Sequence, residues 1–162
     1  MKTSLPIAAL CSVFLSSCAP QTDAASGEET AQPSGADGSG QPTKVLTTET
    51  AKTTSEEWGT FVEYFAGETG GVSDLLSGTA TIKPGLEIHP PHRHAEEEFL
   101  MVLEGEGEWT VGEEVFSAKK GDMLYAAAWD SHGIKNTGSE PLTFVFWKWN
   151  SKGLPVPVDP EV

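Results

Sequence analysis

The sequence predicts an all-β domain, and two observations lead to this fold class. After residue 58 the chain consists of short apolar or alternating runs separated by turn-forming residues such as glycine, proline and asparagine. This is the pattern of half-buried strands joined by turns. No run of useful length in this region has the 3.6-residue period of an amphipathic helix. Many short, evenly spaced strands predict a β-sandwich or a β-barrel.

The expected strands follow one another closely through the domain. Turn sequences rich in glycine separate them, among them GETGG at 67–71 and the bend that Gly105 and Gly107 allow. Residues 136–141 have the composition of a loop before the last strand. The strands expected from these signals are residues 60–65, 73–83, 98–103, 108–111, 115–116, 123–126, 132–135 and 142–149.

Residues 1–17 have the features of a targeting segment. Lys2 supplies a positive start, and residues 5–15 form an apolar run too short to span a bilayer. The run ends in Leu-Ser-Ser-Cys at 15–18, which resembles a bacterial lipobox and implies a lipid-modified Cys18. The alternative is an ordinary secretory signal that is cut elsewhere. The first interpretation predicts a lipoprotein anchored at the cell envelope, on the periplasmic or extracellular face.

The segments that flank the domain have compositions of their own. Residues 18–43 offer almost nothing apolar to bury, so they are expected to form a disordered linker. Residues 44–57 are rich in threonine and predict an N-terminal arm or an edge strand. Residues 58–150 hold the domain. Residues 151–162 contain three prolines and predict an extended tail that packs on the domain or on a neighbour.

Three potential metal ligands lie close together in the stretch GLEIHPPHRHAEEEFLMVLEG. His92, His94 and Glu98 have the same parity, so on a β-strand their side chains would point to one face. Two imidazoles and a carboxylate on one face are suited to a first-row metal ion. His132 lies far along the chain, and a sheet that folds back on itself would bring it to the same place.

Two neighbouring glutamates compete with Glu98 for the role of ligand. Glu97 has the wrong parity for a regular strand, and Glu96 lies near the point where the strand begins. Glu98 is preferred because it directly precedes the apolar run FLMVL.

These residues resemble the two signatures of the cupin superfamily. The first signature is matched with one extra residue in its first spacer, and the second is matched except that Ala127 stands for a proline and Trp129 for a glycine. The 15 residues between the two signatures are close to the shortest spacing found in cupins. The matching positions are Gly85, His92, His94, Glu98 and Gly105 in the first signature, and Gly121, His132 and Asn136 in the second.

The resemblance implies a fold, a metal site and a pocket. It selects the double-stranded β-helix, or jelly-roll cupin barrel, as a single domain after the signal peptide and linker. It implies a divalent transition metal (Fe, Mn, Ni, Co, Cu or Zn) held by His92, His94, Glu98 and His132, with two open positions on an octahedral ion. Two further residues are candidates for the pocket. Trp129 would narrow or line it. His89 would shape its mouth or bind substrate, or else be a partly exposed loop residue.

The function is expected to be metal-dependent chemistry on a small molecule at the cell envelope. A net charge of −14, from 24 acidic and 10 basic residues, argues against nucleic acid as a partner. The preferred hypothesis is a dioxygenase-like enzyme, and a non-redox isomerase or lyase is the alternative within the enzymes. A membrane-tethered module that binds or senses a small molecule is the non-catalytic alternative. Cupins often dimerise through strand exchange, so a homodimer is a further expectation.

Overall fold

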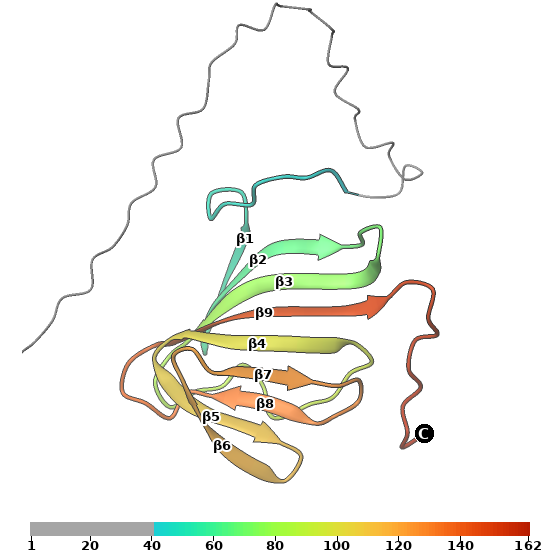
Figure 1. Ribbon diagram of the computed structural model, residues 1–162. Coiled ribbons are helices and arrows are strands. Elements are labelled where there is room, and N and C mark those ends of the chain that lie inside the picture. The colour runs from blue at the N-terminus through green and yellow to red at the C-terminus, as the bar shows by residue number, and fades with distance from the viewer. Residues whose placement is uncertain (1–40) are drawn as a thin grey trace, which may run out of the picture. The chain divides into compact units, whose positions relative to one another are not determined.

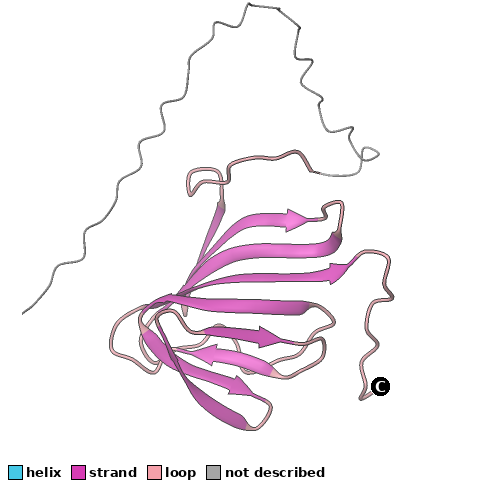
Figure 2. Ribbon diagram, viewed as in Figure 1, coloured by secondary structure: helices cyan, strands magenta, loops and turns pink. Residues whose placement is uncertain are grey.

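The computed structural model describes residues 41–162, and every regular element in this range is a β-strand (Figures 1 and 2). The predictions for the signal at 1–17, for Cys18 and for most of the linker lie outside the described residues. Within residues 41–162 there is no helix that could span a membrane. The strands are β1 (Lys52–Glu56), β2 (Gly59–Gly67), β3 (Val72–Ile82), β4 (Glu97–Glu104), β5 (Glu106–Val111), β6 (Glu114–Lys119), β7 (Met123–Ala126), β8 (His132–Lys135) and β9 (Leu142–Ser151).

Two antiparallel sheets make up the domain. One sheet has six strands in the order β1-β2-β3-β9-β4-β7, and the other has three in the order β6-β5-β8. The last long strand, β9, lies between β3 and β4, so it joins the two halves of the larger sheet (Figure 1). The all-β, jelly-roll prediction is therefore confirmed. The Thr-rich segment holds β1, which pairs with β2 at one edge of the larger sheet.

The core lies between the two sheets because alternate residues of each strand face inward. On β9, for example, Leu142, Phe144 and Phe146 are buried, whereas Trp147 is 38% exposed. The core cluster consists of Ala80, Ile82, Leu100, Val102, Trp109, Ala118, Ile134, Leu142, Phe144 and Phe146. Aromatic side chains provide much of the volume of this core, as the aromatic-rich sequence predicts.

Gly105 lies where the chain passes from the larger sheet, at β4, to the smaller one, at β5. Its φ is 79°, in the left-handed region that side chains rarely adopt. A Cβ atom here would lie 2.4 Å from the carbonyl oxygen of Pro141 and 2.8 Å from the Cα atom of Leu142. The crossing between the sheets therefore requires glycine at this position, both for its backbone conformation and for its lack of a side chain.

The C-terminal segment after β9 runs back along the domain and contacts two loops. Trp129 donates its indole N–H to the carbonyl oxygen of Pro157 at 2.8 Å. Arg93 forms ion pairs with Asp159 at 3.2 Å and with Glu161 at 2.7 Å. Both loop residues lie within three positions of a histidine that matches the cupin signatures, so the tail contacts the segments that build the candidate site.

Candidate metal centre

Glu98 is placed by the strand period of β4. It is 7% exposed and points between the sheets, as do the buried residues Leu100 and Val102 two and four positions further on. Glu97 points to the other face, where its carboxylate accepts a hydrogen bond from the hydroxyl group of Tyr125 at 2.6 Å. Glu98 and Glu97 therefore point to opposite faces of β4, as their parity in the sequence predicts.

His132 is the first residue of β8 and is 2% exposed. It forms an isolated antiparallel bridge with His92, with backbone hydrogen bonds of 2.9 Å in both directions between the two residues. This bridge brings together two histidines that are separated by 40 positions in the sequence.

His92 and His94 do not lie on a strand with Glu98, because β4 begins only at Glu97, so the parity argument from the sequence does not apply to the two histidines. Pro90 and Pro91 precede them, and proline has no backbone N–H with which to continue a sheet ladder. The segment around His92 and His94 is therefore a loop that is held at one point by the bridge to β8. Strand alternation does not make the histidines converge; the bridge and the loop path do so.

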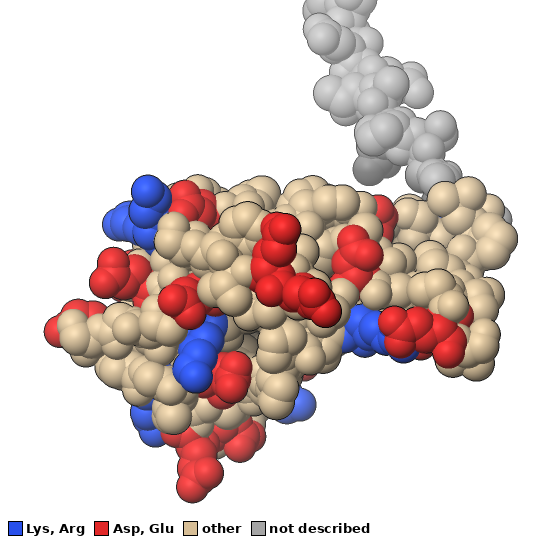
Figure 3. Space-filling model, turned by 90° about the horizontal axis from the view of Figure 1, so that it is seen from below, with Lys and Arg blue, Asp and Glu red and all other residues tan. Residues whose placement is uncertain are grey.

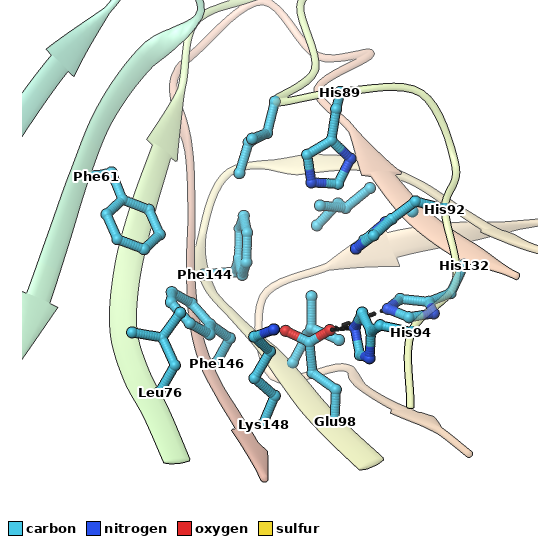
Figure 4. A pocket seen from close by; sticks show the side chains of 14 residues that line it. Phe61, Leu76, His89, His92, His94, Glu98, His132, Phe144, Phe146 and Lys148 are labelled. Atoms are coloured by element: carbon cyan, nitrogen blue, oxygen red, sulfur yellow. Dashed lines mark hydrogen bonds and ion pairs between the residues drawn. The ribbon is translucent and has the colours of Figure 1, made fainter. Parts of the chain in front are cut away.

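The three histidines nevertheless meet at one place, and Glu98 meets two of them. Each of His92, His94 and His132 offers a ligand atom, and these atoms lie within 4.8 Å of one another. One carboxylate oxygen of Glu98, Oε2, lies 3.1 Å from His94 Nε2 and 2.9 Å from His132 Nε2. Figure 4 shows the imidazoles grouped on one side of the pocket with the Glu98 carboxylate beside them.

The hydrogen bonds of His94 and His132 determine which nitrogen of each imidazole carries a proton. His94 Nδ1 lies 3.0 Å from the carbonyl oxygen of Glu96, and His132 Nδ1 lies 2.8 Å from that of Asp130. A carbonyl oxygen can only accept, so both Nδ1 atoms carry a proton, and in the neutral form of each ring an Nε2 lone pair faces Glu98. Backbone carbonyls orient metal-binding histidines in this way.

This set of atoms fits a metal ion. Two lone pairs and an ionised carboxylate oxygen face one another at about 3 Å, and each is an acceptor, so a proton or a cation must lie between them. Two ligands at about 2.1 Å from one ion and at right angles to each other would be about 3 Å apart. The buried Nδ1 of His92 has no hydrogen-bond partner within residues 41–162, which leaves this ring free to turn a nitrogen toward an ion. The centre can therefore hold a transition metal.

The protonation states in the metal-free protein agree with this reading. Burial alone would raise the pKa of Glu98, but the contacts with His132 and then His94 outweigh it and lower that pKa to about 2. Burial, reinforced by the neighbouring His89, lowers the pKa of His92 to about 4. Burial also acts to lower the pKa of His132, but the hydrogen bond with Glu98 raises it overall. At neutral pH Glu98 is thus ionised and His92 is neutral, the states in which each binds metal.

Sequence reasoning missed Lys148, which adjoins the centre, and the role of Glu96. The carboxylate of Glu96 lies 3.3 Å from His94 Nδ1, and it also accepts a hydrogen bond from Lys148 Nζ at 3.0 Å. Glu96 therefore supports His94 from behind instead of competing with Glu98. The signal for Lys148 was in the sequence: it has the same parity as the apolar residues of β9 that face the core.

A pocket of about 200 Å³ adjoins the centre and is open to solvent on part of its boundary. Apolar and aromatic side chains form most of its wall, and the three histidines with Glu98 form one side (Figure 4). The apolar lining residues are Phe61, Leu76, Ile88, Leu100, Ile134, Phe144 and Phe146.

The two pocket candidates have different positions. His89 lines the pocket, and the centroid of its ring lies 4.1 Å from that of His92 in an edge-on contact. Trp129 is not among the lining residues, so the expectation that it narrows the pocket is not met. Its φ of 68° explains why a glycine is usual here, and its indole is held by the tail at Pro157. The way into the pocket is therefore not closed by this side chain.

Asn136 secures a turn. It is fully buried, and its side-chain amide donates to the carbonyl oxygens of Ile82 and Glu140, each at 2.8 Å. Its side-chain oxygen accepts a hydrogen bond from the backbone N–H of Gly138 at 3.0 Å. Asn136 thus holds the loop between β8 and β9 and lies outside the metal centre.

The comparisons with known proteins agree with this fold. Residues 78–148 match the family model of the cupin domain. An RmlC-like cupin from Shewanella frigidimarina superimposes with a TM-score of 0.55 at 16% identity, over 68% of this chain and 95% of the other. A predicted oxalate decarboxylase from Thermotoga maritima superimposes with a TM-score of 0.53 at 22% identity, over 65% of this chain and 98% of the other. The domain is a small member of the cupin superfamily.

Two curated relatives are dioxygenases. A gentisate 1,2-dioxygenase from Streptomyces is 34% identical over 73 residues, which are 44% of this chain and 19% of the relative. A 5-nitrosalicylic acid 1,2-dioxygenase from Bradyrhizobium is 36% identical over 77 residues, which are 46% of this chain and 37% of the relative. The similarity thus spans well under half of either relative.

Proposed function

We propose that this protein is a metal-dependent cupin dioxygenase that acts on a small hydroxylated aromatic acid. The observation that carries the proposal is the convergence of three imidazoles and one ionised carboxylate on the wall of an apolar pocket. Four such ligands leave open positions on an octahedral ion, and here those positions would face a space that a small molecule can enter.

The chain's own residues hold and shape this site. His92, His94 and His132, together with Glu98, would hold the ion, and the carbonyls of Glu96 and Asp130 keep two of the rings in the required tautomer. When bound, a redox-active ion such as Fe(II) or Mn(II) would supply the one-electron chemistry that lets O₂ react with an aromatic ring. The aromatic walls exclude water around the bound substrate.

The relatives support an aromatic acid as the substrate class. Gentisate and 5-nitrosalicylic acid, which appear in their names, are both benzoic acids with a hydroxyl group next to the carboxylate. A single substituted ring suits a pocket of about 200 Å³ with phenylalanine walls.

Oxygen consumption by the reconstituted protein tests the proposal. Metal-free protein would be loaded anaerobically with Fe(II), Mn(II), Ni(II), Cu(II) or Zn(II) and then mixed with 2-hydroxybenzoates in oxygenated buffer. We expect oxygen uptake with a redox-active ion, its loss in His92→Ala, and its retention in Glu97→Gln, whose side chain points away from the centre.

Two other results would replace the dioxygenase by an alternative. Turnover with Zn(II) and without O₂ would indicate an isomerase or lyase. Binding of the acids to the metal-loaded protein, without turnover under any condition, would indicate a binding or sensing module.

We also propose that the enzyme works at the cell envelope. The support is the Leu-Ser-Ser-Cys sequence at 15–18, which would attach the chain to a membrane through a lipid on Cys18. The domain would then act on small molecules on the periplasmic or extracellular side.

A further inference from the structure

Lys148 is a cation at an inward-facing position of the barrel. Leu142, Phe144 and Phe146 of β9 are buried, and Lys148 is the next residue of the same parity. Its side chain is 26% exposed and lines the pocket. A charged group in such a place is costly unless it is paired, and an apolar residue would complete the alternation of the strand. Packing alone therefore does not explain why a lysine occupies this position.

Lys148 lies next to the metal centre. It is directly opposite Glu98 in the pairing of β9 with β4, and both residues face the pocket. Side chains opposite each other on neighbouring antiparallel strands have Cβ atoms about 4.5–5.5 Å apart. Figure 4 shows Lys148 extending into the pocket beside the Glu98 carboxylate. A molecule in the pocket can therefore contact the ammonium group and the metal centre together.

The hydrogen-bonding capacity of the ammonium group is only partly used. Its side-chain partner within residues 41–162 is the carboxylate of Glu96, at 3.0 Å. An ammonium group has three N–H donors, so two stay free for a bound molecule. Lys148 is also the one lysine or arginine among the residues that line the pocket. In a chain of net charge −14, it gives the pocket a positively charged side chain that can attract an anion.

We propose that Lys148 binds the carboxylate of the substrate and thereby selects aromatic acids over neutral phenols. The ring would lie against Phe61 and Phe146, and a hydroxyl group of the same molecule would face the histidines. In proteins, a cavity of about 150 Å³ with an apolar lining can hold benzene. The pocket of about 200 Å³ therefore accommodates one aromatic ring with its substituents. The inference rests on the proposed function, because it takes the metal centre as the second point of attachment.

Calorimetric titration of the full-length protein tests this role. The protein would be loaded with Zn(II), so that no redox turnover occurs, and titrated with salicylate, with its neutral amide salicylamide and with catechol. In Lys148→Met we expect salicylate to bind about 10 to 100 times more weakly, the range for a lost hydrogen bond to a charged group. Catechol and salicylamide should change by less than about threefold, and Lys148→Arg should retain most of the affinity for salicylate.

The control variant is Lys152→Met. Lys152 follows β9, pairs with Glu68 at 2.8 Å and does not line the pocket, so its replacement should leave all three titrations unchanged. The zinc content and the melting temperature of each variant show whether the site and the fold are intact.

The outcomes separate this inference from the proposed function. Equal affinity for salicylate in wild type and Lys148→Met would overturn the inference alone. Equal losses for salicylate and catechol, or loss of zinc, would also overturn it and would show that Lys148 positions His94 through Glu96. Wild-type protein that binds zinc but none of the three compounds would overturn both. Selective loss of salicylate binding without oxygenase activity would uphold Lys148 and overturn the dioxygenase.

Discussion

Two backbone carbonyls determine how the histidines present their nitrogens to the centre. The carbonyls of Glu96 and Asp130 each hold a proton on Nδ1, so the Nε2 lone pairs of His94 and His132 converge on Glu98. Three acceptor atoms at such short distances repel one another unless a positive charge lies between them. A proton on His132 can also supply that charge, and the hydrogen bond with Glu98 accordingly raises the pKa of His132.

The first prediction concerns the residues of the centre. His92→Ala, His94→Ala and His132→Ala should each abolish stoichiometric metal, because a ligand is lost without a replacement. Glu98→Gln should weaken binding by about tenfold or more, since a neutral amide replaces the anionic oxygen. Metal analysis after dialysis and a chelator competition would measure both effects.

Glu97→Gln is the matched control, because Glu97 directly precedes Glu98 in the sequence and faces Tyr125 on the outer side of β4. It should retain wild-type metal content. Equal losses from Glu97→Gln and Glu98→Gln would show that the face assigned to each glutamate is wrong.

A second prediction concerns the pH dependence of stability without metal. The folded pKa of His92 is about 4, below the value of 6.5 for a free imidazole. Between these values the unfolded chain binds a proton at His92 that the folded chain does not, so the free energy of unfolding should fall as the pH decreases from 6.5 to 4. Because the ring is partly solvated, we expect a loss of about 1–2 kcal/mol instead of the full value for this shift.

Urea unfolding of the metal-free protein at several pH values between 4 and 6.5 would measure this loss. His92→Gln, which does not titrate in this range, should show a smaller slope than wild type. Parallel curves for the two proteins would contradict the prediction. His132 has the opposite effect at higher pH. Its pKa is raised in the folded protein, so its protonated form stabilises the fold at pH values below 6.5. That contribution is lost as the pH rises through the raised pKa.

Among the elements, the centre combines the loop of His92 and His94 with Glu98 of β4 and His132 of β8, and the tail contacts the two loops beside it. One loop carries His92, Arg93 and His94, and the other carries Trp129 before β8. The backbone N–H of Trp129 donates to the carbonyl oxygen of His94 at 2.7 Å, which joins the loops directly. The tail contacts both, at Arg93 and at Trp129. The arrangement of the histidines therefore depends on chain segments that are distant in sequence.

The third prediction concerns this tail. Deletion of residues 155–162 removes the hydrogen bond at Trp129 and both ion pairs of Arg93, so it should lower the free energy of unfolding by about 1–3 kcal/mol. The metal affinity should fall a few-fold, because the two loops lose a shared support. Chemical unfolding and chelator competition would measure the two effects.

Lys152→Gln is the control for the charged contacts of this region, since its ion pair with Glu68 involves neither loop. It should leave metal affinity unchanged. If the deletion also left affinity and stability unchanged, the tail would have no part in holding the site.

At the scale of the whole molecule, the two sheets enclose a pocket inside an acidic surface. Acidic side chains are spread over the face that Figure 3 shows, with basic ones between them. No basic stripe is apparent on this face, in keeping with the net charge of −14 and with the expectation of a small-molecule partner. Lys148, which lines the pocket, then provides a local attraction for anions that the acidic surface does not provide.

The fourth prediction concerns the anchor. If Cys18 carries a lipid, the full-length protein expressed in a bacterial host should be found with the membranes, and Cys18→Ser should release it into the soluble fraction. Fractionation followed by mass analysis of the mature N-terminus would test this. Soluble wild-type protein that begins at a residue other than Cys18 would contradict the lipoprotein assignment.

The fold class could be predicted from the sequence, and so could the three histidines and the glutamate that lie together in the structure. Alternating apolar residues mark which side chains of a strand face the core, so the strands and the orientation of Glu98 against Glu97 could be read locally. The spacing of His92 and His94 from Glu98, with His132 further on, matched the cupin signatures before any geometry was known.

The way in which these residues meet depends on the packing of distant segments. His92 and His94 lie on a loop, where no periodicity predicts direction, and the bridge to His132 depends on the pairing of segments 40 positions apart. The contact of Glu96 with Lys148 depends in the same way on the register of β9 against β4. The place of Trp129 depends on the path of the tail. Such contacts arise from how distant segments pack, and local sequence patterns do not encode that packing.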